Sequence, residues 1–143
     1  MVLGAFLSKA LNLKQGIQHK KVLSIGLGGG TMISYLKTEI NGLEMTAVEV
    51  SEDVVGMAKK WFDVRGTEVV VREGMEWLKT RNENEAAVVF NFVVVGEPFA
   101  IINKHLKHLL TVFFSCFSLT FTLDSNVVVV CTTHPLEFFD ANE

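Results

Sequence analysis

Short apolar runs alternate along the chain with longer segments in which apolar side chains recur every three or four residues. The short runs have the length and β-branched content of buried strands, and the periodic segments have the spacing of amphipathic helices. We expect strands at 22–25, 44–50, 68–72 and 86–95, and helices at 2–12, 31–40, 51–62, 75–78 and 98–110. Repeated strand–helix units of this kind predict a parallel sheet with helices on both faces.

The pattern changes towards the end of the chain. Residues 116–122 alternate apolar and polar side chains, and residues 127–131 form a second apolar run. Turn-forming side chains separate the two runs, which predicts an antiparallel hairpin. The sequence therefore predicts an α/β fold. We expect a three-layer, Rossmann-like doubly wound sheet, mostly parallel, with a C-terminal antiparallel hairpin.

The composition agrees with one domain over residues 1–143. Hydrophobic residues make up 49% of the chain and the mean hydropathy is +0.34, which suits parallel strands covered on both faces. The net charge is −3 and the basic residues are scattered, so we expect no nucleic-acid partner.

Two apolar stretches, 86–102 and 109–123, are candidates for a membrane segment. Polar residues interrupt both, and neither reaches the roughly 20 apolar residues that span a bilayer. No secretory signal is evident, so we expect no membrane partner and a cytoplasmic location.

Cys116 and Cys131 lie in apolar runs without a CxxC motif. The sequence favours buried free thiols in a reducing compartment.

Four glycines and a leucine form the turn between the first strand and its helix: Gly26, Leu27, Gly28, Gly29 and Gly30. A strand, tight turn and helix in this order can hold a nicotinamide dinucleotide, a flavin or S-adenosylmethionine. A dinucleotide fingerprint places its third glycine at the sixth position, which is Thr31 here. The spacing therefore favours S-adenosylmethionine, which needs no phosphate site.

Two acidic positions support an adenosyl ligand. Glu49 ends the second strand, where a carboxylate can accept hydrogen bonds from both ribose hydroxyls and repels a 2′-phosphate. Glu73 and Gly74 follow the third strand. An acidic side chain there can meet the adenine amino group, and glycine allows a close approach of the backbone.

The segments VLSIGLGGGTMISYL, MTAVEVSEDVVGMAKKWFDV and VVVREGMEWL resemble the class I methyltransferase fold, and more narrowly its spermidine synthase-like branch. The resemblance implies methyl or aminopropyl transfer from S-adenosylmethionine or its decarboxylated form. The acceptor, an amine or a protein side chain, is unknown, and a homodimer is an open possibility. It also implies a cofactor-binding set of Gly26, Leu27, Gly28, Gly29, Gly30, Glu49, Val50, Glu73 and Gly74. The glycines would lie at the methionine end, Glu49 at the ribose and Val50 against the adenine face, with Glu73 and Gly74 at its edge.

One part of the family pattern is missing. The family has a strand that ends in acidic residues after the short helix, and these carboxylates face the acceptor. Here residues 79–85 run directly into a strand that carries Asn91 and no carboxylate before Glu97. We therefore expect an internal truncation between about 80 and 90, and we assign no catalytic residue. The alternatives are a non-catalytic nucleoside-binding or interaction module and an NAD-dependent oxidoreductase.

Other candidate residues have simpler interpretations. His105 and His108 are three residues apart on one expected helix, but no third or fourth ligand accompanies them, so we expect no metal site. Trp61 and Trp77 are expected in the core rather than in an aromatic cage.

Overall fold

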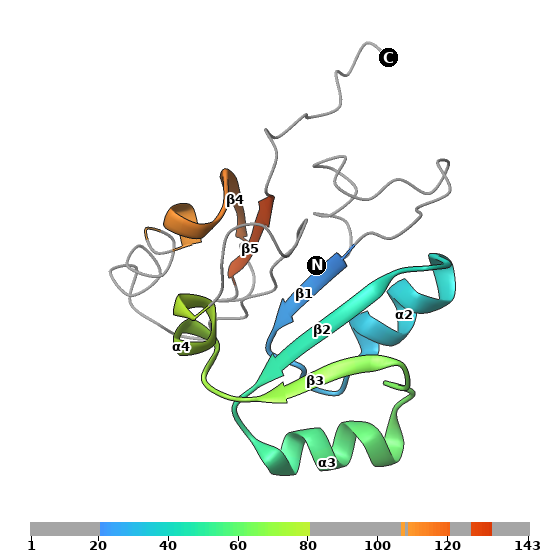
Figure 1. The fold of residues 1–143 in the computed structure, drawn as a ribbon. Coiled ribbons are helices and arrows are strands. Elements are labelled where there is room, and N and C mark those ends of the chain that lie inside the picture. The colour runs from blue at the N-terminus through green and yellow to red at the C-terminus, as the bar shows by residue number, and fades with distance from the viewer. Residues whose placement is uncertain (1–20, 81–106, 108, 121–126, 133–143) are drawn as a thin grey trace, which may run out of the picture.

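The computed structural model describes residues 21–80, 107, 109–120 and 127–132, and the fold is given for these residues. Besides a short helical turn at residues 109–112, the described elements, labelled in Figure 1, are β1 (Lys21–Ile25), α2 (Thr31–Glu39), β2 (Glu44–Glu49), α3 (Glu52–Trp61), β3 (Thr67–Val71), α4 (Gly74–Lys79), β4 (Ser115–Thr120) and β5 (Val127–Thr132). Each lies within one or two residues of its predicted range. Several expected features lie outside the described residues: the helix at 2–12, the strand at 86–95, most of the helix at 98–110 and the expected truncation.

The first three strands form a parallel sheet in the order β1-β2-β3. Ser24 of β1 is in register with Ala47 of β2, which is in register with Val69 of β3. The predicted parallel arrangement is confirmed for these strands. Because all three run in the same direction, their carboxyl ends meet at one edge of the sheet.

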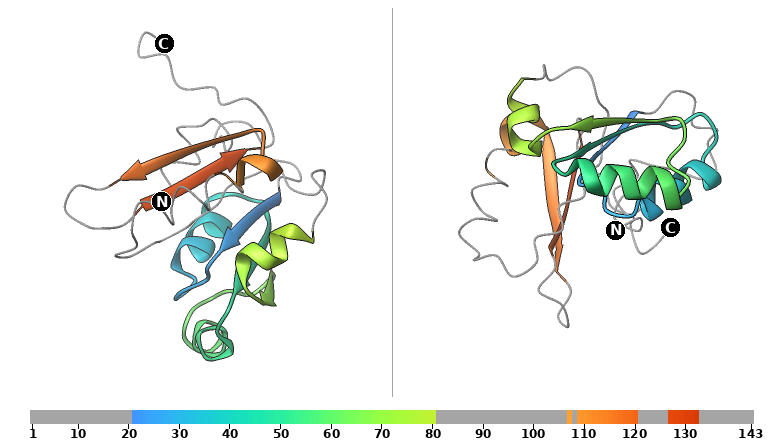
Figure 2. Two further views of the ribbon diagram at one scale, coloured as in Figure 1. Left: turned by 90° about the vertical axis from the view of Figure 1, so that its left-hand side faces the viewer. Right: turned by 90° about the horizontal axis from the view of Figure 1, so that it is seen from below.

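Alternate side chains of β1 enter two different hydrophobic clusters. Val22 packs with Ile33 and Leu36 of α2, whereas Leu23 packs with Leu78 of α4. Figure 2 shows α2 and α3 along one face of the sheet and α4 towards the other. This alternation is expected of a strand that is covered on both faces.

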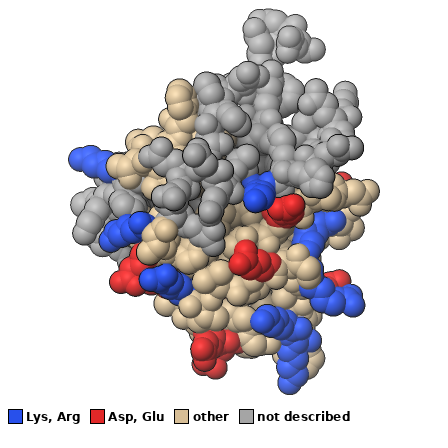
Figure 3. All heavy atoms as spheres, viewed as in Figure 1, with Lys and Arg blue, Asp and Glu red and all other residues tan. Residues whose placement is uncertain are grey.

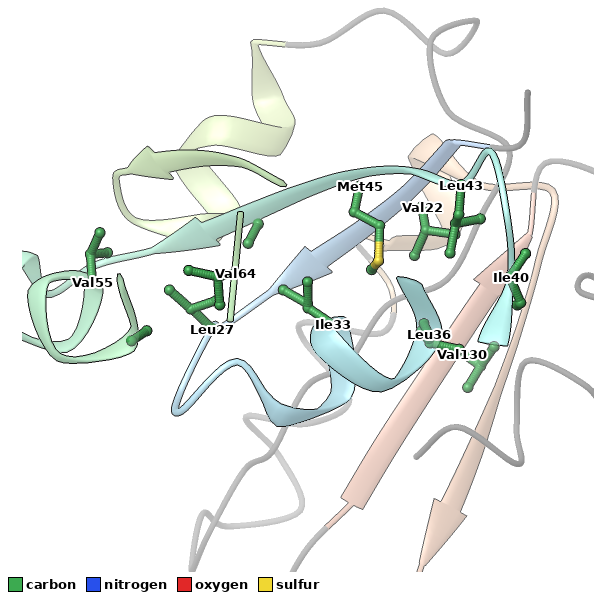
Figure 4. Packing of buried hydrophobic residues seen from close by; sticks show 12 residues of the cluster. Val22, Leu27, Ile33, Leu36, Ile40, Leu43, Met45, Val55, Val64 and Val130 are labelled. Atoms are coloured by element: carbon green, nitrogen blue, oxygen red, sulfur yellow. The ribbon is translucent and has the colours of Figure 1, made fainter. Parts of the chain in front are cut away.

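The predicted antiparallel hairpin is confirmed as β4 paired with β5. Among the described residues it is a two-stranded sheet of its own, and the full three-layer, doubly wound arrangement remains a prediction. Val130 of β5 belongs to the same cluster as Leu36 and Ile40, and Figure 4 shows it beside them. The hairpin is thereby packed against the helix that follows the glycine turn.

The expectation of free thiols is wrong. Cys116 and Cys131 lie opposite each other in the hairpin register and form a disulfide, with their Cα atoms 4.0 Å apart. Cys131 is fully buried. The pairing follows from the register of the two strands, which the residue spacing does not fix.

The two tryptophans differ. Trp77 is buried in the α4 cluster, as expected. Trp61 is 69% exposed, because the buried face of α3 is limited to Val55 and Ala58. The Lys60 ammonium lies 4.9 Å from the centre of the Trp61 ring. The prediction that Trp61 is a core residue is therefore wrong.

Ser51 caps α3, as its position before the helix suggests, with its Oγ accepting a hydrogen bond from the Val54 backbone N–H.

Within the described residues, no helix is both long and apolar enough to cross a membrane. On the face in Figure 3, Lys and Arg side chains are interspersed with Asp and Glu.

Candidate functional site

The carboxyl ends of β1, β2 and β3 surround a cavity of about 570 Å³. The site residues predicted from the sequence all line it: Gly26, Leu27, Gly28, Gly29, Gly30, Glu49, Val50, Glu73 and Gly74. Three connections that are distant in the sequence are therefore brought together by the parallel strands. The cavity volume lies within the range of about 300–1,000 Å³ that is usual for small-molecule sites.

The backbone of the glycine turn needs glycine for two different reasons. Gly28 has φ +53°, and a Cβ atom there would meet nothing within 4 Å. Gly30 has φ +75°, and a Cβ atom there would collide with Cγ1 of Val64. The left-handed backbone favours glycine at both positions, and Gly30 in addition leaves the room that Val64 occupies. The space beside Gly28 stays open.

Glu49 connects the end of β2 to this turn. Its Oε2 accepts hydrogen bonds from the backbone N–H groups of Leu27 at 3.0 Å and Gly28 at 3.5 Å, and its Oε1 accepts one from Ser51 at 3.1 Å. The residue spacing indicated a ligand-binding acid but gave no sign of these bonds. Glu49 is thus a structural element of the turn before any ligand binds.

The electrostatic setting of Glu49 favours its charged form. Partial burial acts to raise the pKa of the carboxyl, but backbone N–H donors from Leu27, Ser51, Gly28 and Val50 together outweigh it and lower the pKa below its ordinary value. The group is therefore an ionised hydrogen-bond acceptor at neutral pH.

Glu73 has a role that the sequence analysis missed. It is the N-cap of α4, and its two carboxylate oxygens accept hydrogen bonds from the backbone N–H groups of Met75 at 3.1 Å and Glu76 at 2.7 Å. An acidic residue immediately before a short helix could have signalled this role. A Cβ on Gly74 would collide with Ile25, so this glycine is required for the contact between α4 and β1.

Two further residues of the cavity were not singled out from the sequence. Ser24 is buried in β1, and its hydroxyl donates a hydrogen bond of 2.8 Å to the carbonyl oxygen of Gly26. A single hydroxyl within an apolar strand was the available signal. Arg72 is exposed at the cavity, where its backbone N–H donates to the carbonyl oxygen of Glu49. Val50, also exposed, adds an apolar side chain to the lining of the cavity.

Other candidates lie elsewhere. Asn91, Glu97, His105 and His108 are outside the described residues. No group of three His, Cys, Asp or Glu side chains that could hold a metal ion occurs in the part of the chain that is described.

The sequence and the fold of this chain resemble those of known proteins. No family model matches the chain. It is 29% identical over 89 residues to the eEF1A lysine and N-terminal methyltransferase homolog of Drosophila melanogaster, a match that covers 55% of this chain. It is 34% identical over 89 residues to the protein of the same name from Drosophila pseudoobscura pseudoobscura, over 59% of this chain. The matches span 13% of the length of each relative.

The three-dimensional similarity extends further along the chain. Human methyltransferase-like protein 13, solved in complex with SAH, superposes with a TM-score of 0.67 at 15% identity, over 99% of this chain and 85% of that one. Spermidine synthase from Thermotoga maritima superposes with a TM-score of 0.56 at 17% identity, over 93% of this chain and 60% of that one. The chain therefore has an α/β fold similar to that of methyltransferases and spermidine synthases.

Proposed function

We propose that the chain binds S-adenosylmethionine at the carboxyl ends of β1, β2 and β3 and serves in methyl transfer to an amine or protein side chain. The observation that carries the proposal is the hydrogen-bonded pair formed by Glu49 and the glycine turn at the mouth of the 570 Å³ cavity. The curated relatives are named as methyltransferases, which favours methyl over aminopropyl transfer.

The residues present fit the nucleoside part of such a ligand. A carboxylate has about four acceptor positions. The bonds from Leu27 at 3.0 Å and Ser51 at 3.1 Å use one position on each oxygen of Glu49. A ribose hydroxyl could replace the long contact with Gly28 at 3.5 Å, while the shorter bond with Leu27 stays in place.

The adenine and methionine ends would occupy opposite parts of the cavity. Val50 would pack against the adenine face, and Glu73, with one acceptor position left on each oxygen, would lie at the adenine edge. The open space beside Gly28 would accommodate the methionine end. When bound, the sulfonium compound supplies an electrophilic methyl group. The chain's own residues contribute binding and alignment of the donor.

The proposal is tested by calorimetric titration with S-adenosylmethionine, S-adenosylhomocysteine, decarboxylated S-adenosylmethionine and NAD. We expect binding of the first two compounds. Binding of NAD alone would contradict the proposal and favour an oxidoreductase, and preference for the decarboxylated compound would favour aminopropyl transfer.

Transfer itself needs a separate assay with radiolabelled methyl donor and protein or amine acceptors. Labelling of an acceptor is the expected result. Donor binding without labelling of any acceptor would favour a non-catalytic nucleoside-binding module. Such a result would agree with loss of the acceptor strand.

A further inference from the structure

The segment between α3 and β3, residues 62–66, packs against the side of the glycine turn that faces the core. A Cβ atom on Gly29 would lie 3.4 Å from Cε2 of Phe62, so the ring lies beside this glycine. Val64 is 5% exposed and occupies the space where Gly30 would otherwise carry a side chain. Two successive glycines of the turn, Gly29 and Gly30, therefore lie beside two side chains of the 62–66 segment.

Leu27 joins the same contact from within the turn. Its side chain is 7% exposed and belongs to the hydrophobic cluster that contains Val64. Figure 4 shows Leu27 and Val64 side by side. The backbone N–H of Leu27 meanwhile donates to Glu49. The turn is thus held by a carboxylate at the cavity and by apolar packing on the core side.

Hydrogen bonds fix this segment to α2, the helix that the turn begins. Ser34 Oγ donates to the carbonyl oxygen of Asp63 at 2.7 Å, and Lys37 Nζ donates to that of Arg65 at 2.7 Å. The Asp63–Arg65 ion pair is exposed and adds little. The buried side chain of Val64 and the two bonds to α2 therefore keep the segment in position.

We propose that Val64 is a positioning residue for the nucleoside donor: it acts through Gly30 and Leu27 to hold the glycine turn in its ligand-binding shape. This inference rests on the proposed function, because it names what supports the donor site. Donor affinity depends on the fraction of molecules whose turn is already in that shape. Loss of packing beneath Gly30 lowers that fraction.

The test compares Val64→Ala with Val22→Ala in the full chain. Val22 is 2% exposed and lies in the same cluster, but it sits near the start of β1 and does not line the cavity. Both variants remove the same atoms from the core. Val64→Thr is the conservative variant, because it keeps a branched side chain of similar volume while it adds a buried hydroxyl.

Two readouts are measured: S-adenosylhomocysteine affinity by calorimetry, and amide hydrogen exchange of residues 27–31 without ligand. For Val64→Ala we expect affinity to fall about tenfold and exchange of the turn to rise about tenfold. Val22→Ala should leave both within about twofold while it destabilises the fold to a similar extent. Val64→Thr should restore the affinity without restoring the stability.

Equal turn exchange in Val64→Ala and Val22→Ala would overturn the proposal. Since exchange is measured without ligand, it decides the role of Val64 even if the wild type fails to bind the donor, a result that would contradict only the proposed function. If Val64→Ala does not fold, Val64→Thr decides the question alone. Its branched side chain should keep the contact with Gly30, so we expect exchange of the turn within about twofold of the wild type although the buried hydroxyl lowers the stability. A rise of about tenfold in turn exchange would overturn the proposal.

Discussion

The Oε2 atom of Glu49 accepts a hydrogen bond from the backbone N–H of Leu27 at 3.0 Å. This bond joins the end of β2 to the turn that follows β1, and it makes the acidic residue part of the turn. A carboxylate held in this way is already oriented before a ligand arrives. The conformational entropy of the Glu49 side chain is therefore lost during folding, and a ligand that bonds to it does not have to order it again.

We expect Glu49→Ala to weaken the binding of S-adenosylhomocysteine by about 1.5–3 kcal/mol, because it removes a charged acceptor and releases the turn. Glu49→Gln should lose less, since one oxygen remains an acceptor. Glu39→Gln is the control, because Glu39 is exposed in α2 and does not line the cavity. Calorimetry measures all three, and an unchanged affinity in Glu49→Ala would refute the role of the carboxylate.

The lowered pKa of Glu49 predicts a pH dependence of stability. The folded state binds its proton more weakly than the unfolded state, so the stabilisation is fully present above the ordinary pKa of 4.5. It is lost as the pH falls through the lower folded value. Urea unfolding of the wild type and Glu49→Gln between about pH 7 and about pH 3 measures this effect. The stability difference should stay constant above the ordinary pKa and shrink below it; a difference that does not vary with pH would contradict the prediction.

The gathering of the site residues could be predicted from the sequence, but their bonding partners could not. Carboxyl ends of parallel strands share an edge, so Gly28, Glu49 and Glu73 had to approach one another. A carboxylate after a strand looks the same whether it faces a ligand or a backbone N–H. For this reason the sequence pattern points to a ligand for Glu49 and Glu73, whereas both already bond to the main chain.

Glu73 should contribute to stability through the start of α4. Glu73→Ala removes both cap bonds and is expected to lower the free energy of unfolding by about 1 kcal/mol. Glu76→Ala is a matched control in the first turn of the same helix, where its side chain is exposed. Chemical denaturation compares the two variants. If Glu73→Ala weakened donor binding and left stability unchanged, a direct adenine contact would be favoured over capping.

The disulfide should make the stability of the hairpin sensitive to reductant. The two cysteines are 15 residues apart, and closing a loop of this length stabilises the folded state by about 3 kcal/mol in the chain-entropy model. We expect dithiothreitol to lower the unfolding midpoint of the wild type but not that of Cys116→Ala/Cys131→Ala. Titration of thiols under denaturing conditions provides the check: two free thiols before reduction would contradict the disulfide and favour the reducing compartment that the sequence analysis expected.

The close contact between Gly30 and Val64 predicts opposite effects for two glycine-to-alanine changes. Gly30→Ala forces a side chain into a left-handed backbone conformation and against Val64, so we expect a loss of at least about 2 kcal/mol in the free energy of unfolding. Gly56→Ala lies in open space within α3 and should stabilise by about 0.5–1 kcal/mol. Urea denaturation measures both. Similar stability in the two variants would mean that the turn does not rest on Val64, because a side chain at Gly30 would then fit without displacing it.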